Sequence, residues 1–322
     1  MRMNPPVKYL ACIVNYRSEE YVKQCVASIT ASAEGLRDAC EIIIADNSPG
    51  ILREHYRGRP GVRVLELDGN PGYGLACNAA VRATAAEWIM IVNPDVLFRP
   101  STFRAVESAV NQGNSPGPGL PGRPQVFTGR ILDPDGGTQV RYDYDFSIMK
   151  TNYLLLFETA PGRFIVNKLL SGRYLKRRYF LKHSDREIQK VDNPSGAFFV
   201  IEKALFDSMG GFDGGIFLYF EDTDLFYRLK KAGYAAYYLP SIEVLHKGGV
   251  STDTAKVFSF LAYKKSLFYF LKKHGAPNLR LKRLILAADA VLLMLSAALR
   301  SPVKKAGLIR GLAGLIKYYL AA

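Results

Sequence analysis

Three carboxylates lie within four residues, Glu221, Asp222 and Asp224, directly after the apolar segment 216–220. Carboxylates beside a buried segment repel one another and resist desolvation, so the cluster needs a metal, a cationic partner or a proton to remove. Asp224 and Arg228 are four residues apart, which predicts a structural ion pair on one helix face. Asp222 is left free near the helix start, where the helix N-terminus favours the carboxylate form that a general base requires. The alternative is a set of first-turn acids without a catalytic role.

A second acidic site follows the apolar run 88–92, where Asn93-Pro94-Asp95 ends a predicted strand. One carboxylate, completed by substrate phosphates, suits Mg²⁺ or Mn²⁺, because these cations prefer oxygen ligands and keep part of their hydration shell. A plain turn is the alternative, since Asn-Pro alone would end the strand. His246 ends the run 242–245 and would face the same cleft, although a lone histidine more often has a structural role. Two acidic strand ends on one sheet indicate chemistry on a phosphate-bearing substrate.

Short apolar runs and helical patterns alternate in the segments that position these residues. The predicted order is strand 7–14, helix 19–33 with Ser18 as N-cap, strand 41–45, strand 62–67, a helix ending near 86 and strand 88–92. This alternation is typical of an α/β fold with a mostly parallel sheet and helices on both faces. Ligands bind at the carboxyl ends of strands in such sheets, and four polar residues fall there: Asn15, Asp46, Asn70 and Asp95.

The chain is less regular beyond residue 112. Residues 113–124 contain four glycines and four prolines, a composition that predicts an irregular loop. Further along, the patterns predict a hairpin of 126–132 with 138–144, a strand at 196–201, helices at 203–209 and 221–232, and two short closing strands at 234–239 and 243–246. Residues 150–190 are basic and aromatic without a clear period, as in a helical arm or a flap.

Basic residues concentrate in two segments. Between Lys264 and Ala322 there are twelve lysines and arginines against one acid, Asp289, and residues 162–190 hold nine against two. The rest of the chain is mildly acidic. This distribution is typical of a protein that docks on an anionic surface, either a membrane or a nucleic acid. The run 284–299 is too short and too charged to span a bilayer, so an interfacial helix is expected there and a second at 304–322.

Two features of the chain predict a cytosolic protein. Its start lacks the pattern of a signal peptide. Its four cysteines show no metal-ligand spacing and are read as reduced thiols.

Taken together, the motifs resemble those of family 2 inverting glycosyltransferases with the GT-A fold, in the rhamnosyltransferase-like branch. The resemblance covers roughly residues 8 to 250, in the family's order. It rests on Ile13-Val14-Asn15-Tyr16, Ala45-Asp46-Asn47-Ser48, Asn70-Pro71-Gly72-Tyr73-Gly74 with Asn78, Asn93-Pro94-Asp95-Val96, Ser195-Gly196-Ala197-Phe198, Gly210-Gly211-Phe212-Asp213, the stretch 221–228 and His246.

The resemblance implies a role for each matching position. Asp222 would be the general base, and Asp95 with His246 would hold a divalent cation on the donor diphosphate. The residues expected to bind the nucleotide sugar are Asn15, Asp46, Asn47, Asn70, Gly72, Gly74, Asn78 and Asn93. Those expected to shape the site or the acceptor pocket are Gly196, Ala197, Glu221, Asp224 and Arg228. A base on one face and a stabilised leaving group on the other suit a single displacement at the anomeric carbon.

Three departures from the family pattern affect the acceptor side. Asn193 stands where relatives often have an aromatic residue, and the segments 113–124 and 150–190 have no clear counterpart. The sequence therefore leaves the acceptor unassigned.

These observations predict a GT-A catalytic domain at 1–255 with the basic insert at 150–190, followed by basic membrane-associated helices at 256–322. The expected reaction transfers a sugar, rhamnose or another deoxyhexose, from a nucleotide diphosphate sugar to a lipid-linked saccharide on the inner face of a bacterial cell membrane, for surface polysaccharide synthesis. A hexose or galactofuranose donor is the near alternative. A silent nucleotide-sugar-binding scaffold and a nucleic-acid-binding protein are the alternatives of another class, and neither explains the acids as well. The oligomeric state is left open.

Overall fold

The computed structural model describes residues 7–35, 39–112, 120, 122–139, 159, 186–248, 253–300 and 306–321. The chain divides into two units, each treated by itself. The first unit comprises 1–145, 183–217 and 221–249, and it is termed the catalytic unit because it holds the predicted catalytic residue Asp222. The helical unit comprises 146–182, 218–220 and 250–322. The expected second hairpin strand, most of the loop 113–124 and nearly all of 150–190 lie outside the described residues.

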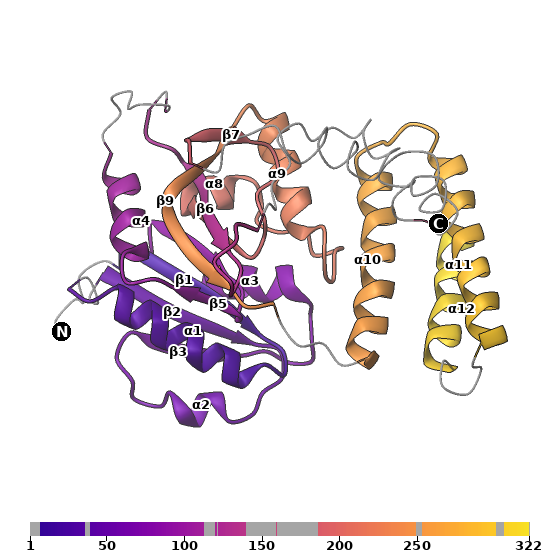
Figure 1. Ribbon diagram of the computed structural model, residues 1–322, viewed down its shortest axis with the longest axis horizontal. Helices are drawn as coiled ribbons and strands as arrows, with labels where there is room; N and C mark the ends of the chain where they lie inside the picture. The colour runs from indigo at the N-terminus through magenta and orange to yellow at the C-terminus, as the bar shows by residue number, and fades with distance from the viewer. Residues whose placement is uncertain are drawn as a thin grey trace. The chain divides into compact units, whose positions relative to one another are not determined.

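A mixed sheet forms the centre of the catalytic unit (Figure 1). Its strands are β1 Tyr9–Asn15, β2 Cys40–Asp46, β3 Val62–Glu66, β4 Trp88–Val92, β5 Val96–Phe98, β6 Val126–Leu132, β7 Gln189–Val191, β8 Phe198–Glu202 and β9 Ala236–His246. The order is β3-β2-β1-β4-β8-β6-β9-β5, and β7 pairs with β9. Strands β3, β2, β1 and β4 are parallel, β8 runs antiparallel to β4 and β6, and β6 is parallel to β9. The predicted α/β fold with a mostly parallel sheet is confirmed for the strands of the first half of the chain, while the later strands pair in both directions.

Helices cover both faces of this sheet, because its central strands are apolar on both sides. Every residue of β1 is buried, and alternate residues enter two separate hydrophobic clusters. One cluster includes residues of α1 Glu19–Ser32, α2 Leu52–His55 and α4 Thr102–Asn111. The other includes residues of α3 Tyr73–Arg82, α8 Lys203–Ser208 and α9 Glu221–Lys231. Each face of the sheet thus packs against its own hydrophobic cluster.

Two sequence expectations about local structure were wrong. The two closing strands form one strand, β9, because a register shift opposite Gly129 and Arg130 of β6 absorbs the irregular middle of β9. Gly129 permits this close approach, since a Cβ there would collide with the Ile242 carbonyl. Ser18 precedes α1 as expected, but within the described chain its side chain caps no backbone N–H. Its hydroxyl donates instead to Asn15 Oδ1, at 3.0 Å.

The helical unit contains α10 Asp253–Lys273, α11 Leu279–Arg300 and α12 Ala306–Ala321, which confirms the expected C-terminal helices. Lys264 and Asp289 form a buried ion pair of 3.4 Å between α10 and α11. The Tyr319 hydroxyl of α12 donates to the Lys264 carbonyl at 3.1 Å. Asp289 can therefore be buried within the apolar run of α11, because Lys264 is its cationic partner inside the unit. Over the described ranges, each helix is too short or too polar to cross a membrane.

Candidate active site

The ends of β1 and β2 bring Asn15 and Asp46 side by side in the sheet. Asn15 Nδ2 donates to Asp46 Oδ1 at 2.8 Å, and the Ser48 backbone N–H donates to the same oxygen at 3.0 Å. Both side chains are fully buried. Asp46 Oδ2 has no hydrogen-bond partner among the described residues. A buried carboxylate oxygen without a donor is costly, so this atom is a candidate acceptor for a ligand N–H or O–H.

A tight loop before α3 extends this site. Asn47 Nδ2 donates to the Gly72 carbonyl at 3.2 Å, while Asn47 Oδ1 is buried and finds no donor in the described part of the chain. Gly72 has φ +98°, and a Cβ there would collide with the Phe217 carbonyl. Asn70 Oδ1 accepts from the Gly72 N–H at 3.2 Å. Glycine is therefore required at 72 for close backbone packing.

Two residues of α3, Gly74 and Asn78, pack against the loop at 210–213. Asn78 is buried, and its amide both donates to the Phe212 carbonyl at 2.8 Å and accepts from the Phe212 N–H at 2.9 Å. A Cβ on Gly74 would lie 2.9 Å from Phe212 Cβ. These contacts give Asn78 and Gly74 a packing role, because they hold the 210–213 loop on α3.

Asp95 and His246 meet because β5 pairs antiparallel with the end of β9, with Val96 opposite His246. His246 Nε2 lies 3.3 Å from Asp95 Oδ2. On the other side of the ring, His246 Nδ1 lies 2.9 Å from Gln139 Oε1. The sequence expectation that these two candidate ligands share one place is thus supported by their geometry.

The donor set of this pair fits a divalent cation. Two ligands in adjacent positions about 2.1 Å from one ion are about 3 Å apart, close to the separation of this nitrogen and oxygen. The described residues contain no group of three or more histidine, cysteine, aspartate or glutamate side chains that could hold a metal. Substrate phosphates and water would therefore have to complete the coordination. Asn93 does not join the pair directly, since its Oδ1 accepts from the Tyr73 hydroxyl at 3.0 Å.

Asp222 lies in the first turn of α9 and is held from two sides. The Gly196 backbone N–H donates to Oδ2 at 2.8 Å, and the Thr223 N–H donates to Oδ1 at 2.7 Å. Burial raises the pKa of this carboxyl, and the hydrogen bonds from Thr223 and Gly196 oppose the rise without cancelling it. The expectation that the helix N-terminus would favour the carboxylate was therefore wrong in its net direction, because desolvation outweighs it. A raised pKa strengthens a general base.

Glu221 is buried beside Asp222, and its Oε2 accepts no hydrogen bond from the described residues. Burial, and then the charge of Asp222, raise the pKa of Glu221 to about 8. Burial also raises the pKa of Tyr73 well above its usual value, and the charges of Glu221 and Asp222 add to this. Near neutral pH Glu221 is thus mainly protonated, which lowers the repulsion that a charged Asp222 would meet.

Asp224 and Arg228 form the predicted ion pair, at 2.7 Å, with Asp224 fully buried. Arg228 also donates to the carbonyls of Met209 and Gly211, at 2.6 Å and 2.8 Å. The pair therefore ties α9 to the loop after α8 and confirms the structural interpretation of this motif.

Ala197 and Asn193 connect the region around Asp222 to the rest of the site. The Asn93 N–H donates to the Ala197 carbonyl at 2.9 Å, which places the Gly196–Ala197 backbone between the end of β4 and Asp222. Asn193 Nδ2 lies 3.4 Å from Thr223 Oγ1, and its buried Oδ1 has no partner within the described segments. Asn193, which departs from the family pattern, thus contacts the residue that follows Asp222 in the chain.

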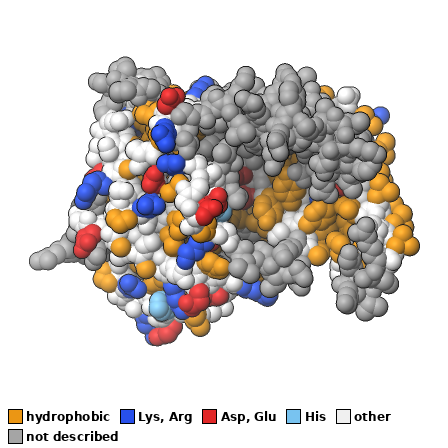
Figure 2. Space-filling view, viewed as in Figure 1, with side chains coloured by type: hydrophobic (Ala, Val, Ile, Leu, Met, Phe, Trp, Pro, Cys, Tyr) orange, Lys and Arg blue, Asp and Glu red, His pale blue; other side chains and the backbone are white. Residues whose placement is uncertain are grey.

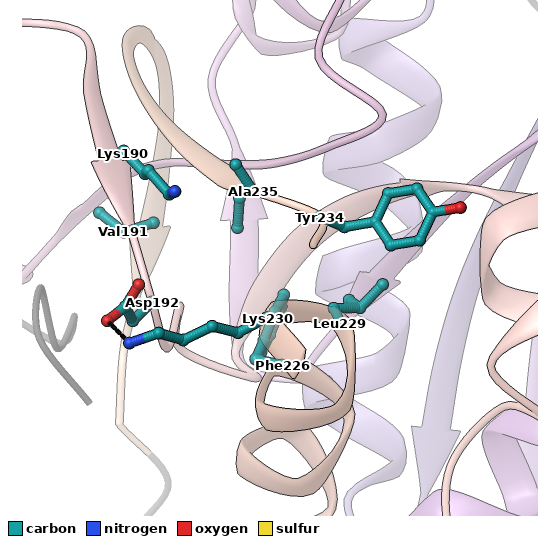
Figure 3. Close-up of a pocket in the computed structure, with 9 residues that line it drawn as sticks. Lys190, Val191, Asp192, Phe226, Leu229, Lys230, Tyr234 and Ala235 are labelled. Carbon is teal, nitrogen blue, oxygen red and sulfur yellow. Dashed lines mark hydrogen bonds and ion pairs between the residues drawn. The ribbon is translucent and has the colours of Figure 1, made fainter. Parts of the chain in front are cut away.

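A small hollow elsewhere in the catalytic unit is separate from these residues. It lies among β7, α9 and the start of β9, and Lys230 and Asp192 form an ion pair of 2.5 Å at its side (Figure 3). The residues that line it include none of the predicted site residues.

Comparison with known proteins agrees with these motifs. Residues 11–168 match the model of the family described as glycosyl transferase family 2. A relative in Mycobacterium tuberculosis (strain ATCC 25618 / H37Rv), named N-acetylglucosaminyl-diphospho-decaprenol L-rhamnosyltransferase, is 28% identical over 316 residues, which cover 92% of this chain and 96% of the relative. The chain is a family 2 glycosyltransferase. Rhamnosyltransferase WbbL of Escherichia coli (strain K12) is 26% identical over 274 residues, 81% of this glycosyltransferase and 91% of that protein.

Solved structures show that this family 2 glycosyltransferase has the GT-A fold. The mannosyltransferase PcManGT from Pyrobaculum calidifontis, in complex with GDP-Man and Mn²⁺, superposes with a TM-score of 0.51 at 13% identity, over 98% of this chain and 88% of that one. TarS 1-349 of S. aureus, in complex with UDP-GlcNAc, superposes with a TM-score of 0.50 at 13% identity, over 96% of this chain and 81% of that one.

Gln139 is a site residue that the sequence reasoning missed. Its only sequence signal is the turn-forming segment 133–137 before it, and that segment says nothing about a partner 107 positions away.

Proposed function

We propose that this glycosyltransferase transfers a deoxyhexose, rhamnose in the first instance, from a nucleotide diphosphate sugar to a lipid-linked saccharide acceptor for a bacterial surface polysaccharide. Both named relatives are rhamnosyltransferases, and the name of one specifies an N-acetylglucosaminyl-diphospho-decaprenol acceptor. A hexose donor is the second candidate, because a hexosyltransferase of Haloferax volcanii, Agl10, is 20% identical over 223 residues.

The observation that carries the proposal is the setting of Asp222. Its two oxygens are aimed by the backbone N–H groups of Gly196 and Thr223, and its pKa is raised by burial. In the proposed reaction, Asp222 accepts the proton of the acceptor hydroxyl while the hydroxyl oxygen bonds to the anomeric carbon. The bond from that carbon to the diphosphate breaks in the same displacement, so the configuration inverts.

Donor binding would use the strand ends. Asp46 Oδ2 and Asn47 Oδ1 are buried acceptors that lack a donor among the described residues, and they suit the N–H of a nucleobase and a ribose hydroxyl. Asp95 and His246 would hold Mg²⁺ or Mn²⁺. A bound cation would stabilise the negative charge on the departing diphosphate. Asn93 would keep its place beside them through Tyr73.

Membrane docking would use the exposed face of α11. Leucines and one isoleucine repeat there within a stripe about 100° wide at 3.6 residues per turn: Leu281, Leu284, Ile285, Leu292, Leu295 and Leu299. Figure 2 shows hydrophobic side chains gathered on the visible face of the helical unit. Exposed Arg280, Arg310 and Lys317 add positive charge to this unit. An apolar stripe with basic neighbours suits the interface of an anionic bilayer, such as the inner face of the cell membrane.

A calorimetric titration tests the proposed function. Nucleotide sugars carrying rhamnose, glucose, galactose and galactofuranose would be titrated with and without Mn²⁺, and transfer to a lipid-linked N-acetylglucosamine diphosphate would be followed. We expect tight, Mn²⁺-dependent binding of a deoxyhexose donor that Asp95→Ala weakens at least tenfold and that the exposed control Asp207→Ala leaves unchanged. Preference for a hexose donor would favour the second candidate. Transfer that proceeds equally well in EDTA would contradict the metal role.

A further inference from the structure

Gln139 joins the turn after β6 to the end of β9 through a side chain that is only 8% exposed. Its Nε2 donates to the His246 carbonyl at 3.0 Å and to Asp133 Oδ1, and its Oε1 lies 2.9 Å from His246 Nδ1. The turn itself is closed by two backbone bonds, from Asp133 N–H to the Gly137 carbonyl and from Gly136 N–H to the Asp133 carbonyl. Gln139 is therefore fixed at both ends.

This network determines the orientation of the Gln139 amide. Its NH₂ group has two hydrogens, and the two groups that it meets, a peptide carbonyl and a carboxylate, are acceptors only. The reversed amide would place its oxygen against both acceptors, which is unfavourable. Oε1 therefore faces the imidazole, and because Oε1 can only accept, His246 Nδ1 must carry a hydrogen.

The consequence appears on the opposite side of the ring. In neutral His246 the hydrogen on Nδ1 leaves Nε2 with a lone pair, and this lone pair faces Asp95 Oδ2 at 3.3 Å. Two electron-rich atoms at this distance repel unless a proton or a cation lies with them. The imidazole is thus held as a nitrogen ligand next to an oxygen ligand.

We propose that Gln139 is a positioning residue, anchored by Asp133, that holds His246 in the Nδ1–H tautomer and so presents Nε2 beside Asp95 as half of a divalent-cation site. This inference rests on the metal site of the proposed function and adds its supporting shell. Hydrogen-bond partners of a metal-binding imidazole fix its tautomer and orientation, and their loss weakens metal affinity about 10–100-fold.

Two readouts test the proposal, one of which requires no metal. Proton–nitrogen correlation spectra of the metal-free protein labelled with [¹⁵N]histidine, recorded where the ring is neutral, report the tautomer of His246. Its signal is identified by its loss in His246→Gln. Calorimetry with Mn²⁺, alone and with UDP, dTDP or GDP, reports the affinity.

The variants separate the hydrogen bond from packing. Gln139→Met keeps the length of the side chain and removes its hydrogen-bonding atoms, and Gln125→Met makes the same change at an exposed position. We expect Gln139→Met to lose the Nδ1–H preference and to bind Mn²⁺ about 10–100-fold more weakly, with Gln125→Met unchanged. Asp133→Asn retains an acceptor for Gln139 and should bind Mn²⁺ nearly as the wild type does.

An Nδ1–H tautomer and a wild-type Mn²⁺ affinity retained in folded Gln139→Met would overturn the proposal. If Gln139→Met does not fold, the wild-type spectrum still decides, because an Nε2–H tautomer of His246 in the metal-free protein would overturn the proposal. A wild-type protein that binds no Mn²⁺ with any of the nucleotides would refute the metal site, and with it the ligand role of His246. The spectra would still decide whether Gln139 sets the tautomer, so the two failures are distinguishable.

Discussion

The backbone N–H of Gly196 donates to Asp222 Oδ2 at 2.8 Å, and a Cβ on residue 196 would lie only 2.6 Å from that oxygen. A residue just before β8 thus sets the position of a carboxylate in the first turn of α9. Any side chain at 196 must displace the carboxylate or lose the hydrogen bond. A substitution at residue 196 can therefore shift the proposed base, Asp222, without removing its carboxylate.

Gly196→Ala should therefore lower kcat by roughly 100-fold while leaving the Kd of the donor nearly unchanged. Misplacing a reacting group by about 1 Å has an effect of this order. Among the hydrogen bonds of the described residues, Gly196 is joined to Asp222 and to none of the proposed donor-binding residues. Single-turnover kinetics and donor titration measure the two quantities. Gly50→Ala is the control, since a Cβ there makes only ordinary contact, 3.7 Å from the Ser48 carbonyl. Equal losses in donor affinity and in rate would show that Gly196 supports the fold of the site as a whole.

Glu221 makes the stability of the catalytic unit fall as pH rises. Its pKa is about 8 in the folded protein against an ordinary value of 4.5, so between these values the folded state holds a proton that the unfolded state has lost. The stability contribution is present below pH 4.5 and is lost as pH rises to about 8. Urea unfolding at pH 5 and pH 8 should show a smaller fall for Glu221→Gln than for the wild type. Parallel falls in the two proteins would mean that Glu221 is ionised in the native state.

The exposed apolar stripe of α11 should drive binding to anionic vesicles. Replacing Leu292, Leu295 and Leu299 by glutamine removes apolar area from the proposed contact face, so the fraction that sediments with phosphatidylglycerol-containing vesicles should fall at least tenfold. Donor binding in solution should not change. Ile51→Gln is the control, because Ile51 is an equally exposed apolar residue outside the helical unit. Undiminished sedimentation of the triple variant would refute α11 as the docking face.

The sequence predicts the first half of the sheet well because its strands are continuous apolar runs, such as Trp88–Val92, which β4 matches residue for residue. It does not predict β5 and β7, since three residues give too little pattern to recognise a strand. Helices are predicted across 256–322, but the bounds of α10 are not, because its apolar and aromatic residues are spread around the helix without a clear period.

Some residues of the site can likewise be predicted from the sequence, and others cannot. Residues within recognisable motifs, such as Asp222 and Asp95, can be nominated from the sequence, and strand order explains why His246 meets Asp95. The roles of Asn78 and Gln139 depend on contacts with Phe212 and His246, more than 100 residues distant, and only the folded chain reveals them. The pKa of Asp222 likewise depends on how deeply α9 buries it, which no local pattern reports.

The most direct test of the account is single-turnover transfer by Asp222→Asn, measured together with its affinity for donor and Mn²⁺. Asparagine keeps an oxygen for one of the Gly196 and Thr223 N–H groups, turns its NH₂ group toward the other, and removes the ability to accept a proton. The account predicts a rate 10²–10⁴-fold below that of the wild type, with Mn²⁺-dependent donor binding within about threefold, and an unchanged rate for the exposed control Asp68→Asn. An Asp222→Asn enzyme that transfers sugar within tenfold of the wild-type rate would contradict the assignment of Asp222 as the base.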